Sequence, residues 1–105
     1  MYRGTTPSFN FILPQAVLLD QLAEVFITFC QENETVFEFK AGDEEVEYIT
    51  SENSIKVTLK QEHTLKLNAD YKVQIQLRVK TLDGTAFASP VFRKDVEKIL
   101  KDGVI

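Results

Sequence analysis

Residues 71–81 read YKVQIQLRVKT, and apolar and polar side chains alternate along this stretch without an exception. Successive side chains of a β-strand point to opposite faces, so the apolar and polar groups separate onto two faces. The apolar set is Tyr71, Val73, Ile75, Leu77 and Val79, and the polar set is Lys72, Gln74, Gln76, Arg78 and Lys80. The pattern predicts a strand with one buried and one solvated face, which is typical of antiparallel all-β proteins.

The length of 105 residues fits one domain, 1–105, and 44% of the residues are hydrophobic. A chain of this size buries roughly 65% of its unfolded surface, which is enough for one core without disulfides. The chain has eight Phe and no Trp. We therefore expect Phe side chains to fill much of the core.

Cys30 is the only cysteine, so no disulfide can form within the chain. The sequence favours a buried, inert thiol over a reactive one. The first nine residues, MYRGTTPSF, lack the apolar run of a secretory signal. No segment approaches the roughly 18 apolar residues of a membrane helix. We expect a soluble protein that is made and kept in a reducing cytosol and does not bind membranes.

The net charge of −4 is unevenly distributed along the chain. Residues 1–54 carry ten acidic and two basic groups (−8), and residues 55–105 carry ten basic and six acidic groups (+4). Acidic and basic strands could pair as neighbours in a sheet. Alternatively, the charge separation could orient copies head to tail or dock an oppositely charged partner. The acidic balance argues against nucleic acid as a partner, because duplex binding needs clustered Lys and Arg.

Turn residues recur along the chain at the short spacing that a small β-sandwich requires. Strands are expected at 9–13, 23–31, 35–40, 46–49, 55–60, 71–81 and 86–96, the last interrupted at Pro90. Pro7 and Pro14 flank the first strand, which suits either an edge of the sheet or the start of a strand. The second strand is apolar on nearly both sides, so its outer face is either covered or meets a partner.

Residues 61–70 are expected to cross between strands with Leu65 and Leu67 pointing inward. A crossover that ends in Tyr71 before a long strand resembles the corner between the fifth and sixth strands of immunoglobulin-like domains, although the usual Asp-x-Gly-x-Tyr spacing is absent. Asp83-Gly84 then predicts a tight hairpin. Together these features predict an immunoglobulin-like antiparallel β-sandwich of about seven strands, with 71–81 as the sixth.

Two segments lack a strand pattern. Residues 15–20 are expected to form a connection, with Leu19 and Leu22 closing the end of the core. The ending, 97–105, is ambiguous: Val96, Ile99 and Leu100 could share one face of a helical turn capped by Gly103.

No pattern of residues indicates catalysis. His63 is the only histidine, and no Ser or Cys motif of a catalytic triad accompanies it, so we expect a solvent-exposed structural side chain. One His and one Cys offer no recognisable zinc spacing. The densest carboxylate cluster lacks the spacing of a calcium loop and predicts a solvated acidic loop; it comprises Asp43, Glu44, Glu45 and Glu47. We expect no enzymatic activity, no cofactor and no metal site.

Four segments that span nearly the entire chain carry a resemblance to known proteins. They read MYRGTTPSF, LAEVFITFCQ, LKQEHTLKLNADYKVQIQLRVKTLDGTAFAS and KILKDGVI. Together they resemble a family of small proteins encoded in phage and prophage structural-gene regions of Gram-positive bacteria, and the most specific pieces are Tyr2–Pro7 and Gln61–Leu67. In strand order such proteins are similar to the immunoglobulin-like N-terminal domain of phage baseplate upper proteins. The resemblance implies a virion component or assembly module without catalytic residues, and the lack of a long C-terminal extension argues against direct receptor binding.

The first hypothesis is therefore a non-enzymatic tail or baseplate module that acts through protein–protein contacts. Its expected partners are other virion proteins or copies of itself, and its expected location is the bacterial cytoplasm during assembly and then the virion. The candidate interface residues are Tyr2, Arg3, Phe26 and Cys30, because Tyr and Arg are enriched at interfaces and Phe26 lies opposite the core face of its strand. A shifted register would turn Phe26 and Cys30 into the core, and the sequence leaves both registers open.

The alternative hypothesis is a carbohydrate-binding or adhesive immunoglobulin-like domain. Sugar sites usually present an aromatic platform, and the available aromatic residues are Tyr2 and Tyr48. The absence of Trp weakens this alternative.

Overall fold

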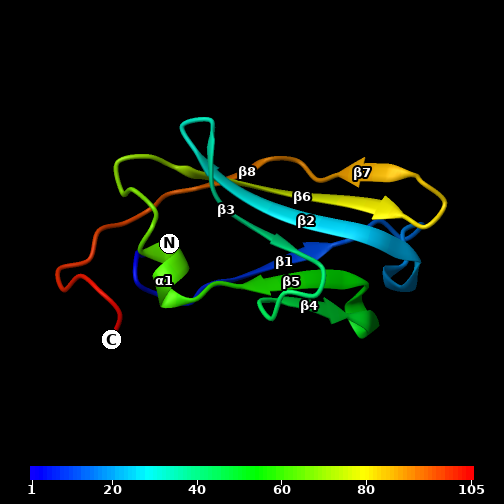
Figure 1. The fold of residues 1–105 in the computed structure, drawn as a ribbon, viewed down its shortest axis with the longest axis horizontal. Coiled ribbons are helices and arrows are strands. Elements are labelled where there is room, and N and C mark those ends of the chain that lie inside the picture. The colour runs from blue at the N-terminus through cyan, green and yellow to red at the C-terminus, as the bar shows by residue number, and fades with distance from the viewer.

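A computed structural model describes residues 1–105 as two antiparallel sheets that pack face to face (Figure 1). The three-stranded sheet has the order β1 (Ser8–Ile12), β5 (Ser54–Thr58), β4 (Val46–Ile49). The five-stranded sheet has the order β3 (Glu34–Lys40), β2 (Leu22–Gln31), β6 (Val73–Thr81), and the far side of β6 pairs with both β7 (Ala86–Ala88) and β8 (Phe92–Lys94). Short helices connect the strands: η1 (Leu19–Gln21), η2 (Thr50–Glu52) and α1 (Gln61–Thr64).

This strand order is that of an immunoglobulin-like sandwich. In that fold, strands B, E and D lie in one sheet, and strands C, F and G lie in the other, where variable-type domains add C′. The order β1-β5-β4 corresponds to B-E-D, without the strand A that this sheet has in immunoglobulin domains, and the order β3-β2-β6-β7 corresponds to C′-C-F-G. The expected all-β sandwich is confirmed, with eight strands because Pro90 divides the last predicted strand into β7 and β8.

The alternating stretch forms β6 from Val73 onward, and Val73, Ile75, Leu77 and Val79 are buried as expected. Tyr71 departs from the prediction, because it precedes β6 and its side chain is 44% exposed. The corner is held by Gln31 of β2, whose Nε2 donates to the carbonyl oxygens of Asn68 (2.8 Å) and Tyr71 (3.0 Å). A buried amide, and not a tyrosine hydroxyl, therefore fixes the crossover to the sheet.

The core consists of 17 buried apolar residues from both sheets and from the segments that flank the strands. Phe29 of β2 lies at its centre and is fully buried. The ring centroid of Phe29 lies 4.7 Å from that of Phe37, 5.8 Å from Phe9 and 5.9 Å from Phe39. The expectation that Phe fills much of the core holds in part, since three Phe belong to the 17 buried residues, two more pack against them and three are exposed.

The predicted Asp-Gly hairpin joins β6 to β7. Gly84 has a φ of 89°, and its N–H donates to the carbonyl oxygen of Thr81 at 3.0 Å. The Asp83 carboxylate accepts the hydroxyl of Thr81 and the N–H of Thr85, and these bonds lower the pKa of Asp83. At the preceding connection, η1 buries Leu19 as expected.

The structure also bears on the expectations for Cys30, His63 and residues 97–105. Cys30 is half-buried on the outer face of β2, so the prediction of a buried thiol is wrong. His63 was expected to be exposed, yet its side chain is only 13% exposed because it packs against two Phe rings. Residues 97–105 form no helical turn, and Leu100 is fully exposed. The helices of the structure are all too short or too polar to span a bilayer.

Candidate protein docking surface

The four candidate interface residues lie on two separate parts of the molecule. Tyr2 and Arg3 belong to the segment before β1, which makes one parallel bridge from Tyr2 to Glu97. Phe26 and Cys30 lie on the outer face of β2, in the five-stranded sheet. The structure therefore does not join the four residues into one surface.

Arg3 is engaged entirely within the chain. Its Nε donates to the carbonyl oxygen of Leu67 at 2.9 Å, and its Nη2 donates to that of Leu65 at 2.9 Å. Its Nη1 contacts the Asp102 carboxylate at 3.0 Å. The guanidinium thus ties the N-terminal segment to the crossover and to the C-terminal segment, and Tyr2 is the more exposed member of the pair.

The two sequence segments with the most specific resemblance pack against each other. The hydroxyl of Thr64 donates to the carbonyl oxygen of Thr5 at 2.9 Å. Gly4 has a φ of 71°, and a Cβ at this position would lie 2.9 Å from Cδ1 of Ile99. The backbone therefore requires glycine here. These contacts give both segments a structural role at the end of the sandwich that carries α1 and both termini (Figure 1).

The polar cluster around His63 is also structural. The Nδ1 of His63 accepts the N–H of Lys60 at 2.9 Å and so caps α1. Lys60 pairs with Glu44, which raises the pKa of Lys60 and lowers that of Glu44. Glu45 lies 3.5 Å from the Lys60 ammonium and 3.8 Å from Nε2 of His63. No three His, Cys, Asp or Glu side chains gather as metal ligands.

The outer face of the five-stranded sheet presents Phe26, which is 37% exposed. Its cross-strand neighbours are Lys40 on β3 and Arg78 on β6. Cys30, four residues further along this face, contacts the Thr35 hydroxyl at 3.7 Å. Of the two registers that the sequence left open, the structure has the one that turns Phe26 outward.

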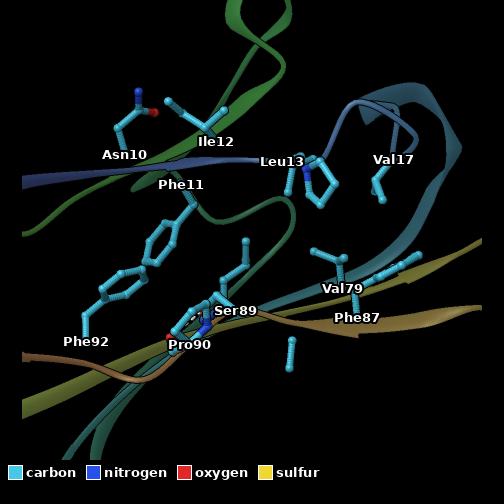
Figure 2. A pocket seen from close by; sticks show the side chains of 13 residues that line it. Asn10, Phe11, Ile12, Leu13, Val17, Val79, Phe87, Ser89, Pro90 and Phe92 are labelled. Carbon is cyan, nitrogen blue, oxygen red and sulfur yellow. Dashed lines mark hydrogen bonds between the residues drawn. The ribbon is translucent and has the colours of Figure 1, made fainter.

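An apolar groove of about 360 Å³ lies between the two sheets, and we call it the edge groove (Figure 2). It lies between β1 on one side and β6, β7 and β8 on the other. Figure 2 shows Phe11 and Phe92 pointing toward each other, and their ring centroids are 5.9 Å apart. The lining residues are Asn10, Phe11, Ile12, Leu13, Pro14, Val17, Leu77, Val79, Phe87, Ala88, Ser89, Pro90 and Phe92.

The edge groove opens where both sheets end without a further strand. β1 pairs only with β5, and β7 and β8 pair only with β6. Around this opening the side chains of Ile12, Phe87, Val91 and Phe92 are exposed. Exposed apolar side chains beside unpaired strand edges are typical of surfaces that bind other proteins.

An edge position was one of two interpretations of the first strand, and the edge groove was not predicted. Its lining comes from segments as distant as Phe11 and Phe92, and their meeting depends on how the sheets stack. The available signals were the flanking prolines and the absence of any charge in Ser8–Ile12. No protein-family model and no curated protein matches this chain.

Proposed function

We propose that this protein is a non-enzymatic structural or assembly module of a phage or prophage virion, in its tail or baseplate, and that it acts through protein–protein contacts. The observation that carries the protein–protein part is the edge groove, which leaves apolar side chains exposed between two unpaired sheet edges. The virion part is supported by the resemblance of Tyr2–Pro7 and Gln61–Leu67 to phage structural-region proteins.

The edge groove fits a protein partner better than a small substrate. Nine of its 13 lining residues are hydrophobic. Its polar members are Asn10 and Ser89, and the Ser89 hydroxyl is already used, since it accepts the Leu77 N–H at 3.0 Å. Burying apolar surface of this kind contributes roughly 25 cal/mol per Å². Docking of apolar side chains against the groove would therefore be favourable.

The test is whether the protein enters particles. Particles from an induced lysogen that carries the gene would be banded on a density gradient and probed with an antibody against this protein. We expect the protein to sediment with the particles, and deletion of its gene to yield incomplete or non-infectious particles. Recovery only at the top of the gradient, together with unchanged infectivity of the deletion strain, would contradict the proposal.

Two matched variants locate the docking surface in the same assay. Phe92→Asp places a carboxylate at the edge groove, and Phe26→Asp places one on the outer face of the five-stranded sheet. Both side chains are partly exposed, so both variants should fold. We expect Phe92→Asp to reduce incorporation more than Phe26→Asp, and the reverse order would place docking on the outer face.

A carbohydrate-binding or adhesive domain is the second candidate. Tyr48 lies beside a hollow of about 480 Å³ with Asp20, Thr50 and Asn53, which combines an aromatic ring with polar groups. The amide of Asn53 is already bound to the carbonyl oxygens of Pro14 (3.3 Å) and Val17 (2.9 Å), which reduces its capacity for a sugar. Binding on a glycan array that Tyr48→Ala abolishes would favour this candidate.

A further inference from the structure

β1 is the least protected strand edge of the molecule. Natural proteins keep sheet edges from pairing with other chains by charged side chains, prolines or very short strands. β3 carries Glu34, Glu38 and Lys40, β4 carries Glu47, and β8 carries Arg93 and Lys94. β7 spans only three residues and is followed by Pro90. β1 has five residues, SFNFI, with neither a charge nor a proline among them.

The hydrogen bonds at both ends of β1 determine which backbone groups are free. The N–H of Leu13 donates to the carbonyl oxygen of Asn53 at 2.9 Å, and the N–H of Leu59 donates to the carbonyl oxygen of Pro7 at 2.9 Å. Both pairs continue the β1–β5 register, in which Phe9 lies opposite Val57. Antiparallel partners exchange hydrogen bonds at every second residue, so the odd-numbered residues of β1 bond to β5. The N–H and C=O groups of the even-numbered residues, Ser8, Asn10 and Ile12, point away from the sheet.

From this arrangement we infer that β1 pairs antiparallel with β1 of a second copy of the chain across a two-fold axis at Asn10. This inference deepens the proposed function, on which it rests, by naming the partner and the surface. The register centred on Asn10 places Ser8 opposite Ile12 of the second copy, so all three outward residues are paired within β1. Each such pair exchanges two hydrogen bonds.

The absence of charged side chains on β1 favours a second copy as the occupant. At a two-fold axis, the central residue faces its own copy, so any charged side chain there would meet a like charge. Asn10 itself is neutral, and its Nδ2 donates to Oε2 of Glu52 in the same chain at 3.3 Å, so the amide oxygen is the group that remains to accept a hydrogen bond from the second copy. The other edge strands of sufficient length would bring like charges together in a symmetric pair, for example Glu38 of β3 or Glu47 of β4.

The same pairing would cover the edge groove. Joining the two β1 strands makes one continuous sheet, β4-β5-β1-β1-β5-β4, and the second sheet of each sandwich packs about 10 Å from the first. The β7–β8 edges of the two copies would therefore lie side by side, and Phe87 and Phe92 of each groove would face the other copy. Pro90 prevents a continuous ladder there, so hydrogen bonds form at β1 and side chains pack at β7–β8.

A cysteine pair tests the register directly in the full chain. In a Cys30→Ser background, Asn10→Cys places two thiols opposite each other. Cα atoms of a hydrogen-bonded antiparallel pair lie about 5.5 Å apart, within the range of a disulfide. The matched control, Ile12→Cys, places its two thiols four residues out of register, about 13 Å apart. We expect mild oxidation to convert most of the Asn10→Cys variant, and little of the Ile12→Cys variant, to a covalent dimer.

A second measurement does not depend on oxidation. Wild type should shift from 12.0 kDa toward twice that mass in sedimentation equilibrium as its concentration rises to about 1 mM. Because the side chain of Asn10 is exposed, Asn10→Lys should fold, and it should remain monomeric. The control, Tyr48→Lys on β4 at the opposite edge of the same sheet, should dimerise like wild type. Circular dichroism establishes that each variant is folded.

The outcomes separate this inference from the proposed function. No cross-link at position 10, equal cross-linking at positions 10 and 12, or a wild type that is monomeric at every concentration would overturn the β1 pairing. If particles still contain the protein, the proposed function stands without the pairing. If wild type is monomeric at every concentration and Asn10→Lys still no longer enters particles, a strand of a different protein occupies the edge, and the second copy is wrong as its occupant.

Discussion

Phe29 and Phe26 of β2 provide the sharpest test of how this strand is oriented. Phe29 is 0% exposed, whereas Phe26 is 37% exposed on the outer face. Replacing Phe29 by Ala removes the ring that contacts Phe9, Phe37 and Phe39. Deleting a buried Phe costs about 3–5 kcal/mol, through lost transfer free energy and the cavity left behind.

The same substitution at Phe26 should have a much smaller effect. Its neighbours on the sheet surface, Lys40 and Arg78, are flexible and solvated, so no closed cavity forms. Substitutions on an exposed sheet face span about 1 kcal/mol, and we expect a loss of that size. The two variants should therefore differ by at least about 2 kcal/mol in their free energy of unfolding.

Urea denaturation monitored by far-ultraviolet circular dichroism measures both losses, since the chain has no Trp to report by fluorescence. In thermal unfolding, each 1 kcal/mol lowers the Tm of a domain of this size by about 4–8 °C, so Phe29→Ala should lower it by at least about 12 °C. If Phe29→Ala does not fold, Phe29→Leu supplies the smaller step in the same direction. Equal losses, or a larger loss at Phe26, would refute the register of β2, because a one-residue slip exchanges the two faces.

Four further substitutions test the contacts that close the ends of the sandwich. Arg3→Met leaves two crossover carbonyl oxygens without a charged donor and should lower the free energy of unfolding in urea by about 2–4 kcal/mol. Asp102→Asn changes an exposed carboxylate and should lower it by less than about 1 kcal/mol. Similar losses for the two variants would show that the Arg3–Asp102 ion pair dominates. Gln31→Met removes the side-chain hydrogen bonds that fix the crossover to β2 and should lower the free energy of unfolding by about 2–4 kcal/mol. A smaller loss would mean that water replaces the amide as a hydrogen-bond partner. The Lys60 hydrogen bond holds the pKa of Glu44 below 4.5, so its stabilising contribution is complete above that pH and is lost as the pH falls through the lower folded value. Wild type and Glu44→Gln should therefore differ in unfolding free energy at neutral pH and converge in acid, and a difference that grows in acid would contradict this sign.

Local sequence patterns predicted most of the strands and their order of appearance. The observed β4 begins and ends at the expected residues, 46 and 49, and β6 has the expected inward face. These predictions succeeded because alternation of apolar side chains and Asp-Gly turn chemistry act over a few neighbouring residues. The sandwich class followed from the number and spacing of the strands.

The contacts that the sequence did not predict join segments far apart in the chain. Tyr71 shares the alternation of its neighbours, yet a turn at 68–70 held by Gln31 takes it out of the strand. His63 looks like a surface residue beside Glu62, but α1 turns it onto Phe37 and Phe39. In both cases a long-range contact decides burial, and local alternation carries no information about it.

The candidate docking surface, like the fold, was predictable only where local sequence patterns decide it. Pro7 and Pro14 were compatible with an edge position of β1, because proline is tolerated where a strand's N–H is not needed by a ladder, but they also fitted the start of a strand. The edge groove was not predictable, since Phe11 and Phe92 meet only after both sheets have formed and stacked. Arg3 was chosen for its residue type, and the structure shows that intrachain carbonyl groups use its donors.

Hydrogen exchange of the backbone amides of β1, resolved residue by residue by NMR at low and high protein concentration, tests most directly whether this edge docks a second copy. We expect the amides of Phe9 and Phe11, which bond to β5, to be protected at both concentrations. The amides of Ser8, Asn10 and Ile12 should exchange freely in dilute protein and become protected as the concentration rises. Free exchange of these three amides at both concentrations would contradict the pairing of β1 strands, and protection already present in the monomer would contradict the orientation of β1 on which it rests.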